Sequence, residues 1–145
     1  MATVLTTAVD RFANAKDEAQ LRELEASLGT FVPALCGEEE FRALLSVFER
    51  FPDEDGFGVF WSIVHLLEAC RGYESALVQS VRRKPSEFNL IMISRLINGG
   101  VTSVKGQSLL AVLAGVGSNT AATLRAMDCA RELLAYHAAQ GRAEA

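Results

Sequence analysis

Residues 61–100, WSIVHLLEACRGYESALVQSVRRKPSEFNLIMISRLINGG, contain the longest apolar segments of the chain and its densest basic cluster. Gly72 and Pro85 divide this stretch into three segments, and both residue types interrupt helices. Ser86, directly after the proline, is a favourable N-cap because its hydroxyl can accept a hydrogen bond from a backbone N–H of the first turn. We therefore predict three consecutive helices, over about 57–70, 73–84 and 86–98.

Apolar residues recur at helical spacing in the rest of the chain as well. Leu5, Ala8, Val9 and Phe12 fall at i, i+3, i+4 and i+7, which predicts a first helix of about thirteen residues. Asp17 is expected to cap a second helix that ends where Gly29 adopts the left-handed conformation. Further helices are predicted over 38–51, over 106–116 and over 120–140, the last one capped by Ser118 or Asn119 and directing Leu124, Met127, Ala130, Leu133, Leu134 and His137 inward.

The expected fold is all-α, with about eight helices in a single domain over 1–145 and a frayed tail at 141–145. No segment of five or more residues alternates apolar and polar residues with β-branched enrichment, so we predict no sheet. Short connections favour antiparallel pairs, namely 38–51 with 57–70, 73–84 with 86–98, and 106–116 with 119–140. We favour an irregular HEAT-like stack of these hairpins, with the most apolar helices, 57–70 and 86–98, buried. A compact orthogonal helical bundle is the alternative.

The composition restricts the classes of function. The chain has 145 residues, of which 50% are hydrophobic, and a net charge of -4. This charge argues against non-specific binding of nucleic acid or of an anionic membrane, since both require excess Lys and Arg. No apolar run approaches the ~18 residues of a membrane span. Three cysteines, an odd number, favour a reducing cytosol, and the segment MATVLTTAVDRF lacks the basic start of a signal peptide. We expect a cytoplasmic protein.

Few side chains are arranged for chemistry. His65 and Glu68 form a single H-x-x-E pair, whereas carboxylate metal sites in helical bundles use the reverse motif twice with two further glutamates. We expect His65 to be hydrogen-bonded in the core and Glu68 to reach its edge. The turn at 53–56 lacks the glycine and glutamate positions of an EF-hand calcium loop. Cys36, Cys70 and Cys129 are interpreted as buried and structural. The sequence therefore predicts no metal, no cofactor and no enzymatic activity.

Two charged patches remain. The acidic patch comprises two triplets at opposite ends of one predicted helix, Glu38, Glu39 and Glu40 at its start and Asp53, Glu54 and Asp55 after its end. The basic patch at 82–84 lies at the C-terminal end of its helix, where cations suit the helix dipole. Both patches have a simple structural interpretation, as a solvated rim and as helix-end charges.

The string from His65 to Val101 resembles the small helical immunity proteins of bacterial polymorphic toxin systems, contact-dependent or type VI. The matching features are a histidine-leucine-glutamate helix (65–68), a GYE helix start (72–74), a basic-proline break (83–85) and an R-x-x-N-x-G helix end (95–100). They fall within residues 57–101.

This resemblance implies that the chain binds one cognate toxin C-terminal domain in the cytoplasm and blocks its active site or a neighbouring surface. The toxins of such systems include basic nucleases, which an acidic surface would attract. We therefore assign the partner interface to Glu38, Glu39, Glu40, Asp53, Glu54 and Asp55. Two other functions stay open: a helical-repeat interaction scaffold or adaptor, and a regulator that binds a small ligand between its apolar helices.

Overall fold

The computed structural model describes residues 3–144, with side chains described through residue 141. This part of the chain forms eight α-helices, three short 3-10 segments and one small hairpin, so the all-α prediction is confirmed. The α-helices are α1 (Val4–Arg11), α2 (Glu18–Thr30), α3 (Glu38–Arg50), α4 (Val59–Cys70), α5 (Glu74–Arg83), α6 (Glu87–Asn98), α7 (Leu109–Ala114) and α8 (Leu124–Glu144). The 3-10 segments are η1 (Pro33–Leu35), η2 (Gly56–Gly58) and η3 (Gly115–Ser118).

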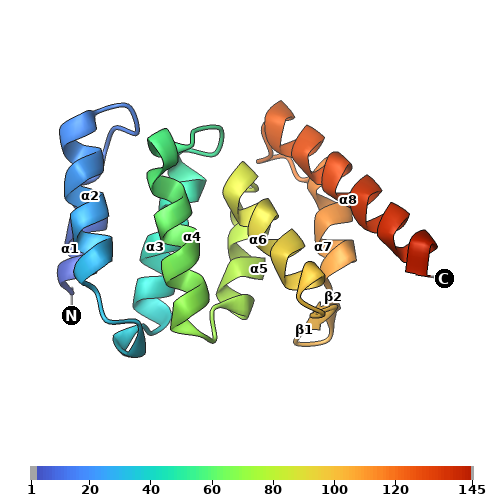
Figure 1. Cartoon of the computed structure of the whole chain (residues 1–145). Coiled ribbons are helices and arrows are strands. Elements are labelled where there is room, and N and C mark those ends of the chain that lie inside the picture. Colours follow the sequence, from blue (N-terminus) through green and yellow to red (C-terminus); the bar gives the residue numbers. More distant parts are fainter. Residues whose placement is uncertain (1–2, 145) are drawn as a thin grey trace.

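Consecutive helices pair as antiparallel hairpins, and the hairpins follow one another in a row (Figure 1). Each odd-numbered helix contacts the next odd-numbered helix, so that α1, α3, α5 and α7 form one layer. The even-numbered helices α2, α4, α6 and α8 form a second layer in the same way. The chain is thus a two-layered stack of four helical hairpins, and the three predicted hairpins are all present.

A chain of phenylalanine rings joins the first three hairpins inside the stack. Phe12 packs edge-on against Phe60, with ring centroids 6.3 Å apart. Phe88 stacks on Phe48 at 5.5 Å and meets the Phe60 ring edge-on at 5.7 Å. All four side chains are at most 4% exposed. Edge-to-face and offset pairs add about 0.5–1.5 kcal/mol each beyond the burial of their surface, so this cluster fixes the hairpins relative to one another.

Local signals placed most helix starts correctly. The Asp17 carboxylate accepts a hydrogen bond from the backbone N–H of Gln20 at 3.1 Å, as expected of an N-cap. Ser86 caps α6 in a reciprocal arrangement, because its hydroxyl accepts from the backbone N–H of Asn89 while the Asn89 side-chain oxygen accepts from the backbone N–H of Ser86.

Tertiary contacts changed several predicted helix ends. The first helix stops at Arg11 instead of running about thirteen residues, and the Arg50 guanidinium donates to the carbonyl oxygens of Val9 and Phe12 at 3.1 and 2.7 Å. Gly29 does not end α2, which continues through Thr30 without a left-handed residue. The prediction that Ser118 or Asn119 caps the last helix is wrong.

That last helix, α8, begins at Leu124. The Thr123 hydroxyl accepts from the backbone N–H of Ala126 at 3.1 Å and donates to Asp53 at 2.8 Å, so a contact with a distant loop sets this helix start. In consequence Leu124 is 81% exposed instead of inward, while Ala126 is fully buried. The backbone of α8 is helical through Glu144, and fraying of the tail stays a prediction, with residue 145 outside the described residues.

Three further expectations are wrong. The three cysteines are partly exposed at the edge of the core, and not buried as the sequence predicts. Residues Ser103–Val104 (β1) and Gln107–Ser108 (β2) pair as an antiparallel hairpin, which the absence of alternating segments did not reveal because each strand has only two residues. Helix α4 is not buried on every side: Trp61 is 37% exposed and His65 is exposed. In a two-layered stack one side of each helix faces outward, even where that side is apolar.

Candidate functional site

The first acidic triplet starts α3, and only part of it faces solvent. Glu38 and Glu39 are exposed, whereas Glu40 is 7% exposed. Glu40 is therefore not part of the accessible acidic surface. The two exposed carboxylates line an open groove of about 490 Å³ between α1 and α3, together with Asp10, which sequence analysis did not include because it belongs to a different helix. The rest of the lining is Thr6, Arg42, Ala43 and Ser46.

The second acidic triplet lies in the loop before α4, and each of its members has a partner within the protein. Asp53 accepts the hydrogen bond from Thr123, and the Asp55 carboxylate accepts from the backbone N–H of Phe57 at 2.9 Å. Glu54 lies 3.8 Å from the ammonium of Lys16. The 13 residues of α3 separate the two triplets by about 20 Å at 1.5 Å per residue. The fold does not join them into one patch.

A second exposed surface follows the outer side of α4. Trp61 and His65, four residues apart, are exposed on it, and Phe57, in η2 just before the helix, is 73% exposed. The Trp61 indole packs edge-on against the buried Phe88 ring, with ring centroids 5.3 Å apart. The centroid of the His65 ring lies 6.2 Å from that of the indole. Part of the indole is thus anchored in the core while the rest faces solvent.

An arginine from the neighbouring helix α6 completes this surface. The guanidinium of Arg95 lies 6.0 Å from the centre of the Trp61 ring. Two hydrogen bonds join it to the Glu68 carboxylate, from Nε at 2.7 Å and from a terminal nitrogen at 2.8 Å. These hydrogen bonds raise the pKa of Arg95 above its ordinary value. The fork geometry fixes the guanidinium over the indole. We call Trp61, His65 and Arg95 the α4 surface.

The backbone at Phe57 is strained. Its φ of 50° and ψ of 41° place a non-glycine residue in the left-handed region, between Gly56 and Gly58, which also have positive φ. This conformation costs an L-residue about 1–2 kcal/mol. It presents the Phe57 side chain beside a groove of about 300 Å³ between α2 and α4, lined also by Glu18, Leu21, Arg22, Glu25 and Val59.

The prediction that His65 is hydrogen-bonded in the core is wrong, whereas the prediction that His137 points inward is confirmed. His65 is exposed, whereas His137 is 8% exposed and its Nε2 shares a hydrogen bond of 2.8 Å with the hydroxyl of Ser94, itself 6% exposed. Burial lowers the pKa of His137. A serine–histidine pair could activate a nucleophile, but here both groups are covered. The pair instead ties α8 to α6.

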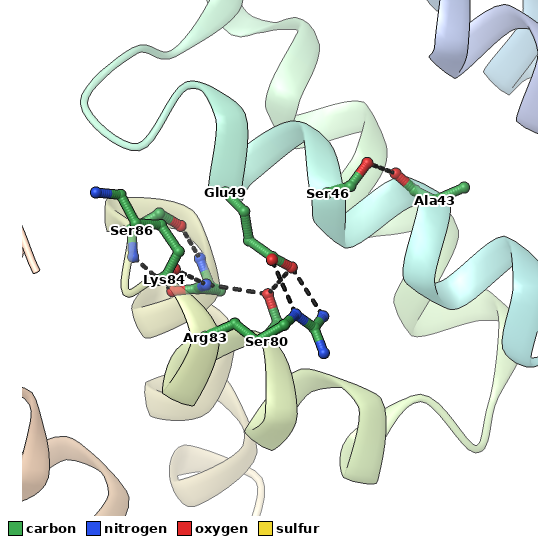
Figure 2. Close-up of polar contacts among 8 residues, drawn as sticks. Ala43, Ser46, Glu49, Ser80, Arg83, Lys84 and Ser86 are labelled. Carbon is green, nitrogen blue, oxygen red and sulfur yellow. Dashed lines mark hydrogen bonds and ion pairs between the residues drawn. The ribbon is translucent and has the colours of Figure 1, made fainter. Parts of the chain in front are cut away.

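A polar network joins α3, α5 and α6 (Figure 2), with Ser80 and Asn89 buried and Arg83 exposed at its edge. The Glu49 carboxylate accepts from the Ser80 hydroxyl at 2.8 Å and from Arg83 at 3.0 Å through each of two nitrogens. Asn89 donates to the Ser80 oxygen at 3.2 Å and to the Lys84 carbonyl at 3.0 Å. Every group in it has a partner, so the network supports the fold.

The basic cluster at 82–84 is engaged in the same way. Arg83 binds Glu49, and the Lys84 ammonium donates to the carbonyl of Ala121 at 2.7 Å. The Arg82 carbonyl accepts from the side chain of Asn119 at 2.9 Å. The contacts of Lys84 and Arg82 attach the third hairpin to the loop before α8, and that of Arg83 attaches it to α3.

Comparison with protein-family models, curated proteins and solved structures found no match to this chain. Among the described residues, no group of three or more His, Cys, Asp or Glu side chains is placed to hold a metal ion. No helix within residues 3–144 is long and apolar enough to cross a membrane. The α4 surface, on the layer of even-numbered helices, is the candidate functional site, and the acidic groove lies between α1 and α3 of the other layer.

Proposed function

We propose that the chain is a bacterial immunity protein that binds one cognate toxin domain in the cytoplasm and neutralises it by covering its active site or an adjacent surface. The observation that supports this proposal is the α4 surface, an exposed tryptophan and arginine held in fixed positions on a two-layered helical stack. The resemblance of residues 57–101 to helical immunity proteins supplies the partner class.

The residue types of the α4 surface suit protein recognition. Tryptophan, tyrosine and arginine dominate the binding energy of protein interfaces. Because Phe88 and Glu68 already fix Trp61 and Arg95, little side-chain entropy remains to be lost on binding. Strained residues often persist where function requires them, and the left-handed Phe57 presents an exposed aromatic ring beside the groove between α2 and α4.

The acidic groove of Asp10, Glu38 and Glu39 has a different role in this proposal. Together with the net charge of -4 it would attract a basic toxin domain, such as a nuclease, and raise the rate of association. The α4 surface would then determine how long the complex persists, since most affinity differences lie in the dissociation rate.

A scaffold that presents the stack to several partners is the second candidate, and the repeated hairpin architecture favours it. Co-expression separates the two. If the protein is an immunity protein, it protects cells that express the toxin C-terminal domain encoded immediately upstream of its own gene, and the two proteins co-purify. If that domain gives neither protection nor a complex, the immunity proposal is refuted.

Substitutions then locate the interface in the purified complex. We expect Trp61→Ala to raise Kd about 30-fold or more, as a hot-spot substitution of about 2 kcal/mol would. Tyr136→Ala is the matched control, because Tyr136 is an aromatic residue of similar exposure on α8. Replacing Glu38 and Glu39 together by lysine should slow association and leave dissociation unchanged. Equal effects of Trp61→Ala and Tyr136→Ala would show that the α4 surface is not the interface.

A further inference from the structure

A small groove of about 180 Å³ lies between α5 and the β1–β2 hairpin. Strand β1 packs against α5, so the helix forms one wall of the groove and the hairpin forms the other. On the helix, Ser75, Gln79 and Arg82 fall at i, i+4 and i+7 and therefore share one side. The full lining is Ser75, Val78, Gln79, Arg82, Val104, Lys105 and Gln107. The groove exists because the hairpin folds back onto α5.

Two cations and, among the described residues, no carboxylate line this groove. Arg82 lies in the last turn of α5, and Lys105 lies in the turn between the two strands. Neither cation takes part in an ion pair or a side-chain hydrogen bond within the described part of the chain, and Arg82 is engaged only through its backbone carbonyl. The other two members of the basic cluster at 82–84 bind Glu49 and the Ala121 carbonyl. Two positive charges therefore stay available to a ligand.

The backbone at Lys105 is strained. The strand register pairs Val104 with Gln107, which leaves Lys105 and Gly106 as a two-residue turn with φ of 48° and 79°. Turns of this kind need positive φ and prefer asparagine, aspartate or glycine at the first position. Strained residues cluster where function requires a particular side chain. A lysine here supplies an ammonium group beside the groove, which none of the preferred residues would do.

We propose that this groove binds one phosphate group, either as free phosphate or as the phosphate monoester of a small molecule. The site belongs to α5 and the hairpin, so it shares no residue with the α4 surface. The inference does not depend on the proposed immunity function.

The lining matches a phosphate group in charge and in hydrogen-bond donors. A phosphate monoester carries a charge of about −1.5 to −2 near pH 7, which the two cations balance. A guanidinium forms two parallel hydrogen bonds to phosphate oxygens. The side chains of Ser75, Gln79 and Gln107 can donate to the remaining oxygens. Val78, which is buried, and Val104, which is half-buried, are the apolar part of the lining, and apolar walls concentrate the field of a groove lined by one sign of charge.

The volume of the groove restricts the size of what it holds. Pockets that bury a whole drug-sized ligand have about 300–1,000 Å³. The groove of about 180 Å³ has room for roughly six water molecules at about 30 Å³ each. This space accommodates a phosphate group but not the molecule that carries it. We therefore expect the rest of a phosphate monoester to remain in solvent.

The test titrates the isotope-labelled full-length protein with sodium phosphate, glycerol phosphate or sodium acetate at pH 7 and constant ionic strength, followed by two-dimensional NMR. Both phosphate compounds should shift the amide signals of residues 75–82 and 103–108 until the site is saturated. Acetate, with one charge and two oxygens, should shift them much less. A lower Kd for glycerol phosphate than for free phosphate would support a carried phosphate group, and the reverse would support the free anion. Equal Kd values for acetate and phosphate, or no localised shift, would overturn the proposal.

Variants locate the binding groups. Arg82→Gln should raise the Kd for phosphate about 10-fold or more, because a hydrogen-bonded charge is lost. Lys105→Asn removes the second charge but keeps a residue that tolerates positive φ, and it should weaken binding as well. The matched control is Arg22→Gln, which removes the same charge from an exposed position on α2 and should leave Kd unchanged. An unchanged Kd in Arg82→Gln, or an equal rise in Arg22→Gln, would show that phosphate senses the net charge of the protein and would overturn the assignment. Both groove variants change exposed side chains, so their circular dichroism spectra should match that of the wild type.

Discussion

Asn89 is the side chain of the polar network between α3, α5 and α6 whose loss should destabilise the protein most. It is fully buried, its Oδ1 accepts from the backbone N–H of Ser86 at 2.8 Å, and its Nδ2 donates to Ser80 and to the Lys84 carbonyl. Asn89→Ala removes all three hydrogen bonds and leaves their partners buried. At about 1 kcal/mol for each hydrogen bond, the free energy of unfolding should fall by about 3 kcal/mol.

Urea denaturation at pH 7, followed by circular dichroism, measures this change. Domains of this size are stable by about 5–15 kcal/mol, so the variant should still fold. The matched control is Asn98→Ala, the same substitution at the exposed end of the same helix, which should change the free energy by less than about 0.5 kcal/mol. If both variants lose the same small amount, the network does not stabilise the junction of α3, α5 and α6.

Gly56→Ala should destabilise the protein by about 2–4 kcal/mol, because φ is +58° and the added Cβ would lie 2.7 Å from two ring carbons of the fully buried Phe60. Gly58→Ala, at φ +89° in open space, should lose only about 1–2 kcal/mol in the same urea assay. His137 should make stability depend on pH: since its folded pKa lies below the ordinary value of 6.5, its contribution is complete above pH 6.5 and is lost as the pH falls below it. His137→Gln should remove this dependence, whereas His65→Gln should preserve it.

Two results would contradict these expectations. Equal losses for the two glycine variants would mean that the ring of Phe60 can move aside, in conflict with its packing against Phe12, Phe48 and Phe88. The second result concerns the difference in free energy of unfolding between the wild type and His137→Gln. If that difference stays the same from pH 8 to pH 5, the imidazole is already solvated in the native state.

The helices and their pairing were predictable because their signals are local. The caps at Asp17 and Ser86 depend on residues within one turn. Short connections bring consecutive helices side by side and antiparallel, so they pack as hairpins. The periodicity of apolar residues identified the buried side of α3 for the same reason.

The candidate site was not predictable, since it depends on how each helix is rotated within its layer. In α4 the sequence is apolar around the whole helix, so nothing local distinguishes the exposed Trp61 from the buried Ile63. Glu40 is 7% exposed although Glu38 and Glu39 are exposed, and nothing local distinguishes one of three consecutive glutamates from the others. Thr123 caps α8 in a loop that contacts Asp53, a residue of another hairpin.

The stacked architecture has a consequence for how the molecule loses its structure. Within residues 3–144, substantial contacts between hairpins join only neighbours in sequence, so the first and last hairpins are each held from one side. In such linear arrays stability approximates a sum of unit and nearest-neighbour terms. Amide hydrogens of α1 and α8 should therefore exchange through local unfolding of one terminal hairpin. Those of α3–α6 should require a more extensive unfolding, and so should exchange more slowly. A partner bound to α4 and α6 would contact both central hairpins and stabilise them relative to each other. Its binding should slow amide hydrogen exchange in α3–α6 and leave exchange in α1 and α8 unchanged.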